Sequence, residues 1–352
     1  MVATDDGLVT TWYYSDDARN WAAPALTTDA VEFHRSLPGY APTPLVDLPA
    51  LAAELGVGRV LVKDESARLG LPAFKVLGAS WACRQVLDRQ PGVRLVTATD
   101  GNHGRAVAHT AAQLGVGASV FVPAVMLPET ADKIAAEGAE VVRVDGDYND
   151  AVHLAAAYAD EQPGRALVQD TAWDGYTEVP GWIIEGYQTL LREVDDELAG
   201  IGASPDLVAV PVGVGSLAEA VVRHYRQPDG PRPRVLSVEP DTAACVLESL
   251  ATGHPATVPT GSTVMAGLNC GTISDTAWPV LRAGLDAAVS VSDEEALRAV
   301  NDLDDLGVSA GPCGAAALAG VRAALTHPER RAALRLGPDA VLVLLSTEGN
   351  HR

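Results

Sequence analysis

Short apolar runs alternate with longer helix-compatible stretches along the chain from about residue 59. The runs are rich in β-branched residues and apolar at nearly every position, as strands buried in a parallel sheet are. Many of them end at Gly, Pro or Asp, which favour turns. The predicted strands are residues 59–63, 94–99, 118–123, 140–145, 165–170, 206–214, 234–240, 287–292 and 340–347.

The stretches between these runs have alanine-rich or amphipathic patterns that predict helices. The clearest are residues 103–115, 128–140, 147–162, 179–200 and 292–307. This alternation predicts βαβ units, so we expect an α/β fold with mainly parallel sheets and helices on both faces. No repeat, low-complexity tract or long linker interrupts it. A second domain, which a length of 352 residues allows, must therefore be interleaved with the first.

Composition and charge exclude several classes of partner. The net charge of −21 repels phosphate, so we expect neither nucleic acid nor an anionic membrane to bind. No apolar stretch approaches the roughly 20 residues of a membrane helix, and the first residues do not resemble a signal peptide. The four cysteines lie far apart and no histidines cluster, so we expect reduced thiols, no metal site and a cytoplasmic protein.

Lysine is rare in this sequence, and one of its three copies stands in an apolar segment. Lys75 lies within "GLPAFKVLGASWA", residues 70–82, whereas nearly all other positive charge comes from arginine. Guanidinium does not lose its proton in proteins, but a desolvated ammonium does so readily. Lys75 is therefore a candidate for chemistry that needs a neutral amine. Lys63 is a weaker candidate, because the adjacent Asp64 and Glu65 can keep it charged and ion-paired.

Polar residues follow the predicted strand at 94–99, in "TATDGNHGRAVA". Ligands of parallel sheets bind beyond the carboxyl ends of strands, where loops enter helices. Asp100, Asn102 and the glycines of this loop can present side chains and backbone N–H groups to an anion such as a carboxylate. Asp and Asn also cap helices, so a purely structural loop stays open as an interpretation. For His103 we expect a structural role, with its ring bonded to nearby backbone.

Two further strand ends carry candidate ligand groups. The segment "AVPVGVGSLAEAV" places Gly213, Val214, Gly215 and Ser216 between a strand and a helix, where a phosphate can approach the backbone. It lacks the GK[ST] ending of a P-loop and the last Gly of GxGxxG, so a tight turn is an equally good interpretation. The last predicted strand runs into Ser346, whose hydroxyl can bond a heterocycle nitrogen or simply end the strand.

Lys75, these two loops and Ser346 form a set that resembles pyridoxal 5′-phosphate enzymes of fold type II, the tryptophan synthase β superfamily. Within it the sequence closely resembles the diaminopropionate ammonia-lyase family. The resemblance extends along nearly the whole chain. The stretches that carry it are "SLPGYAPTPLVDLPALAAELGVGRVLVKDES", "AFKVLGAS", "TATDGNHGRAVA", "VQDTAWDGYTEVPGWIIEGY", "VEPDTAAC", "TVMAGLNCGT" and "LSTEGN".

The resemblance implies two interleaved domains, each with a mainly parallel sheet flanked by helices. Residues 1–66 and 180–352 would form a large cofactor-binding domain, and residues 67–179 a small domain inserted between them. By similarity, Lys75 is the Schiff-base lysine and Ser346 faces the pyridine nitrogen. The other implied cofactor contacts are Asn102 at the 3′-oxygen and Gly213, Val214, Gly215 and Ser216 at the phosphate.

Two acids complete the implied catalytic set. In diaminopropionate ammonia-lyases, acids at the positions of Asp100 and Asp170 assist proton abstraction and recognition of the substrate amine, and both enantiomers react. We therefore expect either Lys75 or Asp100 to remove the α-proton, depending on the face that carries it. Asp170 ends the predicted strand at 165–170, so it can alternatively cap the following loop.

The implied reaction is α,β-elimination of ammonia from 2,3-diaminopropionate or a similar β-substituted small amino acid. It gives pyruvate and ammonia through aminoacrylate. Alternatives with the same cofactor are a β-replacement synthase, in which a second nucleophile captures aminoacrylate, and a serine or threonine dehydratase. A non-catalytic protein that binds pyridoxal phosphate or an amino acid is an alternative of another class. By analogy with fold type II relatives, we expect a homodimer.

The sequence also departs from the family it resembles. Pro72 stands where these lyases more usually carry asparagine. Pro312 and Cys313 stand where an acidic residue and a serine are usual, and Glu219 replaces a small residue after the phosphate-type loop. These positions do not include the cofactor lysine, but they can alter the walls that select the substrate. Cysteines at the positions of Cys245 and Cys270 also occur in relatives, and we expect both to stay thiols here.

Overall fold

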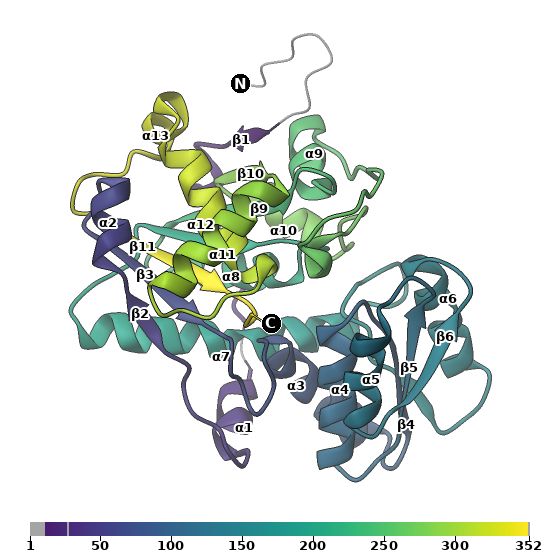
Figure 1. The fold of residues 1–352 in the computed structure, drawn as a ribbon. Coiled ribbons are helices and arrows are strands. Elements are labelled where there is room, and N and C mark those ends of the chain that lie inside the picture. Colours follow the sequence, from purple (N-terminus) through teal and green to yellow (C-terminus); the bar gives the residue numbers. More distant parts are fainter. Residues whose placement is uncertain (1–10, 27, 351–352) are drawn as a thin grey trace. The chain divides into compact units, whose positions relative to one another are not determined.

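The computed structural model describes residues 11–26 and 28–350, and the chain divides into two compact units (Figure 1). The large unit comprises residues 1–28, 41–74 and 188–352, and the small unit comprises residues 29–40 and 75–187. The two units are therefore interleaved along the sequence, as expected. The domain boundaries that the family resemblance implied stay a prediction.

A seven-stranded sheet with the order β1-β10-β9-β8-β11-β3-β2 forms the centre of the large unit. Its five inner strands are parallel, whereas β1 and β2 pair antiparallel at the two edges. The strands are β1 (Trp12–Tyr14), β2 (Leu45–Asp47), β3 (Arg59–Asp64), β8 (Leu207–Pro211), β9 (Arg234–Pro240), β10 (Ala287–Val291) and β11 (Val341–Ser346). Strand β11 lies between β8 and β3, so Ser346 ends a central strand.

Helices cover the strands of this sheet. They are α2 (Pro49–Leu55), α8 (Ser216–Tyr225), α9 (Cys245–Thr252), α10 (Ala277–Gly284), α11 (Asp293–Asp305), α12 (Pro312–Leu325) and α13 (Pro328–Leu334), with 3-10 turns η1 (Ala18–Asn20) and η2 (Ala266–Leu268). Helix α12 packs on β8, β9, β10 and β11, and α11 packs on α12. Consecutive residues of β8 are all fully buried, so both faces of the sheet are covered there, as its apolar sequence predicts.

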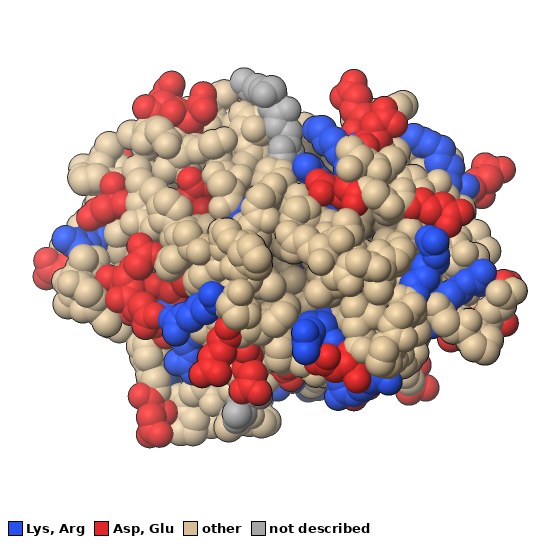
Figure 2. Space-filling view, turned by 90° about the horizontal axis from the view of Figure 1, so that it is seen from below, with Lys and Arg blue, Asp and Glu red and all other residues tan. Residues whose placement is uncertain are grey.

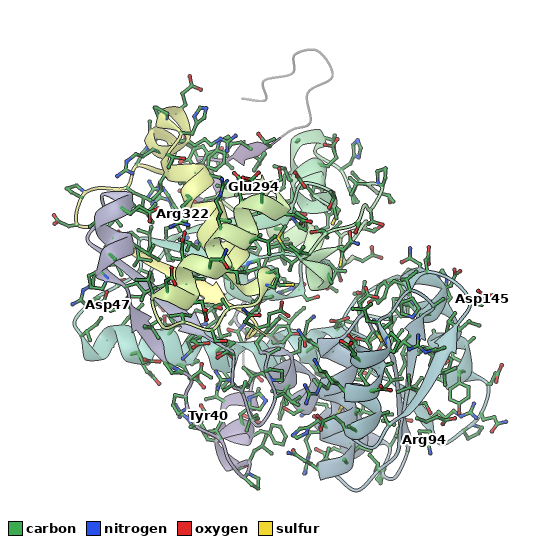
Figure 3. The ribbon with its side chains drawn as sticks, viewed as in Figure 1. Tyr40, Asp47, Arg94, Asp145, Glu294 and Arg322 are labelled. Carbon is green, nitrogen blue, oxygen red and sulfur yellow. The ribbon has the colours of Figure 1, made fainter. Side chains whose placement is uncertain are left out.

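One arginine ties three of these helices together. Arg322 projects from α12 (Figure 3) and donates to Glu54 of α2 at 2.7 Å and to Asp302 of α11 at 2.5 Å. Helix α11 itself begins with a capping box formed by Ser292 and Glu295, which satisfies backbone N–H groups of the first turn. The helical layer over α12 is thus fixed by polar contacts at its rim as well as by its apolar core.

The small unit contains a parallel four-stranded sheet with the order β6-β5-β4-β7. Its strands are β4 (Arg94–Ala98), β5 (Ala118–Pro123), β6 (Glu140–Val144) and β7 (Arg165–Leu167). Its helices are α1 (Ala30–Ser36), α3 (Lys75–Arg89), α4 (Asn102–Gln113), α5 (Pro128–Ala136), α6 (Tyr148–Asp160) and the first part of α7 (Glu178–Gly200). Helices α4 and α5 share one apolar cluster with the sheet, and α6 shares a separate one.

The predicted α/β fold with mainly parallel sheets is confirmed. Every predicted strand is present, as β3 to β11. The predictions omitted β1 and β2, which are only three residues long and lie before the region of clear alternation. The helix predicted at 128–140 ends earlier, at Ala136, because Gly138 follows with a φ of +95° and stops the helix.

The surface carries charges of both signs. Figure 2 shows acidic and basic side chains interspersed on one face of the molecule. Among the helices that the structure describes, none combines the length and the apolar character needed to cross a bilayer.

Candidate active site

The candidate residues predicted from the sequence fall into two groups, one in each unit. Lys75, Asp100, Asn102 and Asp170 belong to the small unit, whereas Gly213 to Ser216 and Ser346 belong to the large unit. In each group the residues lie at the carboxyl ends of parallel strands or at the starts of helices. This is the edge at which such sheets bind their ligands.

Lys75 forms an ion pair with Asp170. It is the first residue of α3, and its Nζ donates to Asp170 Oδ2 at 2.6 Å. Asp170 follows β7 and its side chain is buried, whereas about a quarter of the Lys75 side chain (23%) is exposed. A carboxylate in contact favours the charged form of an amine. The sequence suggested apolar surroundings for Lys75. In the structure, its amine instead contacts a carboxylate.

The charge state of Asp170 follows from its neighbours. Burial by itself raises the pKa of this carboxyl, but the charges of His103 and Lys75 and the hydrogen bond from Lys75 lower it to about 2. Burial also lowers the pKa of His103, so its imidazole is neutral near pH 7. At that pH, Lys75 is therefore the cation that keeps Asp170 ionised.

His103 connects α4 to the segment after β7. Its Nε2 lies 2.8 Å from the carbonyl oxygen of Val168, so the neutral ring carries its hydrogen on Nε2 and donates it there. Its Nδ1 has no hydrogen-bond partner among the described residues and lies 3.8 Å from Asp170 Oδ2. The backbone bond expected for this ring is confirmed.

Asp100 has the opposite electrostatic environment. It follows β4 at the turn into α4, which begins at Asn102. Desolvation by the surrounding protein, with the negative charges of Asp170 and Asp147, raises the pKa of Asp100 to about 7, although the residue is exposed. Two carboxyl groups at one sheet edge therefore differ strongly in pKa. Such a difference suits one group to exchange protons near neutrality and the other to stay charged.

Two tyrosines and a glutamine that the sequence interpretation missed also belong to this region. Tyr187 in α7 is fully buried; burial raises its pKa to about 12, while the charge and hydrogen bond of Lys75 act against this. Gln169 donates through Nε2 to the Tyr148 hydroxyl and accepts from Thr97 Oγ1. No pattern of short motifs reveals these contacts, since they join residues from separate elements.

The loop from Gly213 to Ser216 presents the start of helix α8. Gly215 has a φ of +102°, which glycine adopts without strain. The Val214 carbonyl accepts from Ser274 N at 2.8 Å, and the Gly213 carbonyl lies 3.7 Å from the Cys245 thiol. The carbonyls of Gly213 and Val214 therefore face other groups of the large unit, and the start of a helix is a place where backbone N–H groups can bind a phosphate.

Ser346 offers a hydroxyl group at the end of the neighbouring strand β11. It is 1% exposed, and its Oγ has no hydrogen-bond partner among the described residues. A Cβ at Gly314 would lie 2.8 Å from this oxygen, so the glycine keeps the space beside it open. A buried hydroxyl without a partner costs free energy. Together with the loop after β8, it therefore fits a ligand with a phosphate and a ring nitrogen.

Backbone hydrogen bonds within the large unit hold the segment just before Lys75. Phe74 N donates to the Thr347 carbonyl at 3.1 Å, and Gly349 N donates to the Pro72 carbonyl at 3.0 Å. The residue that precedes Lys75 is thus fixed to the residue that follows Ser346.

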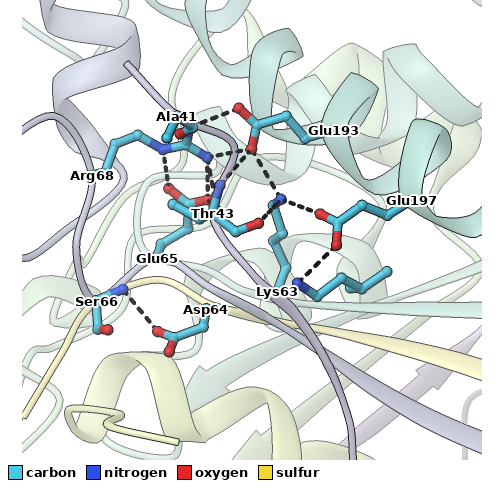
Figure 4. A network of polar contacts seen from close by, with 10 residues as sticks. Ala41, Thr43, Lys63, Asp64, Glu65, Ser66, Arg68, Glu193 and Glu197 are labelled. Carbon is cyan, nitrogen blue, oxygen red and sulfur yellow. Dashed lines mark hydrogen bonds and ion pairs between the residues drawn. The ribbon is translucent and has the colours of Figure 1, made fainter. Parts of the chain in front are cut away.

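A buried ionic network supports the same segment (Figure 4). Arg68 is fully buried and donates to both carboxylate oxygens of Glu65 and of Glu193, at 2.6 to 2.8 Å. Lys63 pairs with Glu193 at 2.9 Å and with Glu197 at 3.0 Å. The network joins β3 and the turn after it to helix α7.

Lys63 is ion-paired as predicted, but the predicted partners are wrong. Its partners come from α7 instead of from Asp64 and Glu65. Neighbouring side chains of a strand point to opposite faces, so Asp64 cannot reach the amine of Lys63. Oδ1 of Asp64 instead accepts a hydrogen bond from Ser66 N, and Glu65 pairs with Arg68.

The positions that depart from the resembling family have identifiable contacts. Glu219 lies in the first turn of α8, 1% exposed; its Oε1 pairs with Arg223 at 2.8 Å and its Oε2 has no hydrogen-bond partner among the described residues. Burial raises its pKa. Pro312 begins α12, where a missing N–H costs nothing. Cys313 N donates to Glu348 Oε1 at 3.3 Å.

The described residues also show how the possible metal ligands and the cysteines are arranged. No group of three or more His, Cys, Asp or Glu side chains within them is arranged to hold a metal ion. Cys83, Cys245, Cys270 and Cys313 form no disulfide bond within them.

Comparison with known proteins gives consistent similarities. A family model described as "Pyridoxal-phosphate dependent enzyme" matches residues 36–348. The chain is 37% identical to diaminopropionate ammonia-lyase of Escherichia coli K12, over 91% of this chain and 87% of that protein. It is 35% identical to the Salmonella typhimurium protein of the same name, over 92% of this chain and 88% of that one.

A solved structure is similar over the same extent. It is diaminopropionate ammonia lyase from Escherichia coli in complex with an aminoacrylate-PLP azomethine reaction intermediate. The TM-score is 0.87 at 34% sequence identity, covering 98% of this chain and 95% of that chain.

Proposed function

Because this chain belongs to the family of pyridoxal-phosphate dependent enzymes, we propose that it eliminates ammonia from 2,3-diaminopropionate or a similar small β-substituted amino acid. Its fold is the type II fold of these enzymes, and its cofactor is pyridoxal 5′-phosphate. The products are pyruvate and ammonia. The observation that carries the proposal is the Lys75–Asp170 ion pair beside a second carboxyl, Asp100, whose pKa is near neutrality.

The groups described above fit the cofactor. Lys75 would supply the amine that attaches to it, and Asn102, the first residue of α4, would bond its 3′-oxygen. The loop from Gly213 to Ser216 suits its phosphate, and the unpartnered Ser346 hydroxyl suits its ring nitrogen. When bound, the cofactor withdraws electrons from the substrate Cα and so makes the α-proton acidic.

The protein side chains then move protons and hold charge. The Lys75 amine takes the α-proton from one face of Cα, and the ionised Asp100 carboxylate takes it from the other. Asp170, ionised well below neutral pH, holds a substrate ammonium group or the Lys75 ammonium. Protonated Asp100 can return its proton to the departing β-amine. Both enantiomers can react because the two bases are different groups.

Other assignments complete the proposal. We infer that the enzyme is a cytoplasmic homodimer, by analogy with fold type II relatives. We also infer that residues 1–66 and 180–352 act as the cofactor-binding domain and residues 67–179 as the small one. Cell fractionation tests the cytoplasmic location, and light scattering tests the dimer. Limited proteolysis tests the domain boundaries.

The substrate is tested by a screen of small amino acids in both enantiomers, scored for keto acid and ammonia. We expect 2,3-diaminopropionate to give both products without an added nucleophile. Product from serine or threonine alone would favour the dehydratase, and a need for a second nucleophile would favour the β-replacement synthase. Bound cofactor without any turnover would favour a binding protein.

The cofactor lysine is tested by borohydride reduction. The label should be fixed to Lys75, and Lys75→Ala should lose the visible absorbance of the bound cofactor. Lys133→Ala, at an exposed lysine of α5, serves as the control and should keep it. Retention of the absorbance in Lys75→Ala would contradict the assignment.

The role of Asp100 predicts a difference between enantiomers. Asp100→Asn should lower kcat about 100-fold or more for one enantiomer and much less for the other, because only one needs this base. Since the carboxylate is the active form, wild-type kcat/KM for that enantiomer should fall as the pH drops below about 7. Asp132→Asn, at an exposed residue of α5, should leave both profiles unchanged. Equal losses for both enantiomers would contradict the role.

A further inference from the structure

A cluster of arginines lies at the amino-end edge of the large sheet. Arg234 is the first residue of β9, and Asp286 directly precedes β10. The loop at Gly213 and the Ser346 hydroxyl lie at the other edge, where β8 and β11 end. Strand β9 has 7 residues, and at about 3.3 Å per residue its two ends are about 20 Å apart. The cluster is therefore separate from the groups assigned to the cofactor.

One member of the cluster has its hydrogen bonds satisfied. Arg226 is fully buried; its Nε donates to the Gly284 carbonyl at 3.0 Å and its Nη1 to the Pro233 carbonyl at 3.0 Å. Its Nη2 pairs with Asp286. The same carboxylate oxygen also accepts from Val235 N at 2.8 Å. Oδ2 of Asp286 is thus shared between Arg226 and the backbone of Val235.

Three further guanidinium groups surround this pair. Arg19 Nε lies 3.6 Å from the other oxygen of Asp286, beyond ordinary hydrogen-bond length. Arg232 Nη1 donates to the carbonyls of Arg19 at 2.5 Å and Trp21 at 3.2 Å, which carry no net charge. Burial and the charges of Arg232 and Arg19 lower the pKa of Arg226, against the effect of Asp286.

Arg234 is the least satisfied member. It is 8% exposed, and its Nε has no hydrogen-bond partner among the described residues. The Tyr14 hydroxyl bonds it, but Tyr14 is neutral and its hydroxyl donates to Asp16 at 2.9 Å. Asp16 in turn pairs with Arg335 at 3.0 Å. A buried guanidinium without a carboxylate of its own is unfavourable unless an anion joins it.

We propose that this cluster binds a phosphate-type oxyanion, with Arg234 as the principal ligand and Arg19 and Arg232 beside it. Guanidinium matches such anions because it donates two parallel bonds to their oxygens. An excess of positive charge at one place is notable in a chain of net charge −21. That net charge also disfavours polyanions, so the ligand is small: inorganic phosphate or the phosphate group of a small metabolite.

The test measures binding of inorganic phosphate and of glycerol phosphate to the holoenzyme by isothermal titration calorimetry. The buffer is zwitterionic, chloride keeps the ionic strength constant, and visible absorbance verifies that the cofactor stays bound. We expect saturable binding of one phosphate per chain. Arg234→Gln should weaken it about tenfold or more, because a charge-assisted hydrogen bond is lost. Arg298→Gln, at an exposed arginine of α11 paired with Glu294, should not change it.

If Arg234→Gln does not fold, Arg19→Gln replaces it, because 34% of the Arg19 side chain is exposed and its loss is better tolerated. Tighter binding of glycerol phosphate than of inorganic phosphate would identify the ligand as a phosphomonoester, and the reverse would identify free phosphate. Absence of saturable binding to the wild-type holoenzyme, or equal affinity in wild type and the Arg234 or Arg19 variant, would overturn the proposal.

Discussion

At the scale of single residues, the small unit separates two carboxyl groups by their electrostatic surroundings. Asp170 faces the Lys75 ammonium, which keeps it ionised. Desolvation, together with the like charges of Asp170 and Asp147, makes ionisation of Asp100 more difficult and raises its pKa. The same residue type is therefore suited to act as a fixed charge at one position and, in the proposed mechanism, as an exchangeable proton acceptor at the other.

Asp170 should stabilise the apoprotein in a pH-dependent way. Its pKa is about 2 in the folded state, below the ordinary value of 3.8. The stabilisation is thus complete above about pH 4 and is lost as the pH falls to about 2, with a total of about 2 kcal/mol. Asp170→Asn should lower the unfolding temperature at pH 6, and the difference from wild type should shrink below pH 4. A difference that is unchanged at pH 3 would contradict the ion pair; Asp132→Asn is the control.

At the scale of elements, helix starts and strand ends bring the binding groups into position. The start of α8 follows β8, Ser346 ends β11, and Phe74 is bonded to the residue after Ser346. Adjacent parallel strands place these groups at one edge of the large sheet. We therefore expect departures from the resembling family at this edge to affect binding of the cofactor.

Glu219 should weaken cofactor binding. Its buried carboxylate lies one turn after Ser216, where negative charge opposes a phosphate. Glu219→Gln keeps the shape and an acceptor for Arg223, so we expect the apoprotein to bind cofactor about fivefold more tightly above neutral pH. Because burial raises the pKa of Glu219, the gain should decrease as the pH falls and the wild-type carboxyl protonates.

Spectrophotometric titration of the apoprotein with the cofactor measures this affinity. Glu294→Gln is the matched control, because Glu294 also pairs with an arginine four residues later but is exposed on α11. Unchanged or weaker binding in Glu219→Gln alone would show that its charge does not act on the cofactor.

The Arg68 network should stabilise the large unit. Arg68→Lys keeps the charge but cannot make the paired bonds to Glu65 and Glu193, so we expect a loss of about 2 kcal/mol. Cofactor should also dissociate faster, because the turn after Arg68 leads into Lys75. Arg84→Lys, at an exposed pair on α3, should have little effect. Urea unfolding of the holoenzyme and loss of visible absorbance measure the two effects, and an unchanged unfolding midpoint would contradict the first.

At the scale of the whole molecule, acidic residues outnumber basic ones by 46 to 25. Repulsion among exposed carboxylates destabilises a compact chain, and salt screens it over about 10 Å at 0.1 M. We expect this negative charge to repel polyanions as well. The two inferred phosphate sites depend instead on local groups: a helix start at one edge of the large sheet and arginines at the other.

Monovalent salt should therefore raise the unfolding temperature of the holoenzyme. We expect a rise of a few degrees between about 0.02 M and about 0.5 M sodium chloride, at saturating cofactor. The same rise in Arg234→Gln would show that it does not come from chloride at the arginine cluster. A fall in both proteins would mean that attractive ion pairs outweigh the repulsion.

The sequence by itself determined the α/β class, the segments of the chain that form the inner strands, and the loops that follow those strands. Hydrophobic period and turn residues are local properties, so they can be read without knowing what packs on what. The scarcity of lysine, which draws attention to Lys75, and the residues of the strand-end loops can be recognised for the same reason. The family resemblance added the cofactor and the reaction, and the comparisons agree with both.

Only the tertiary structure decided which charges meet. Lys63 pairs with acids more than a hundred positions away, Tyr187 approaches Lys75 from another helix, and Asp100 and Asp170 receive opposite pKa shifts. The arginine cluster at the amino-end edge of the large sheet likewise joins Arg19 to Arg226, Arg232 and Arg234, which lie more than two hundred positions later. Electrostatic interactions depend on distance and burial in the folded chain, and neither quantity is encoded by local pattern.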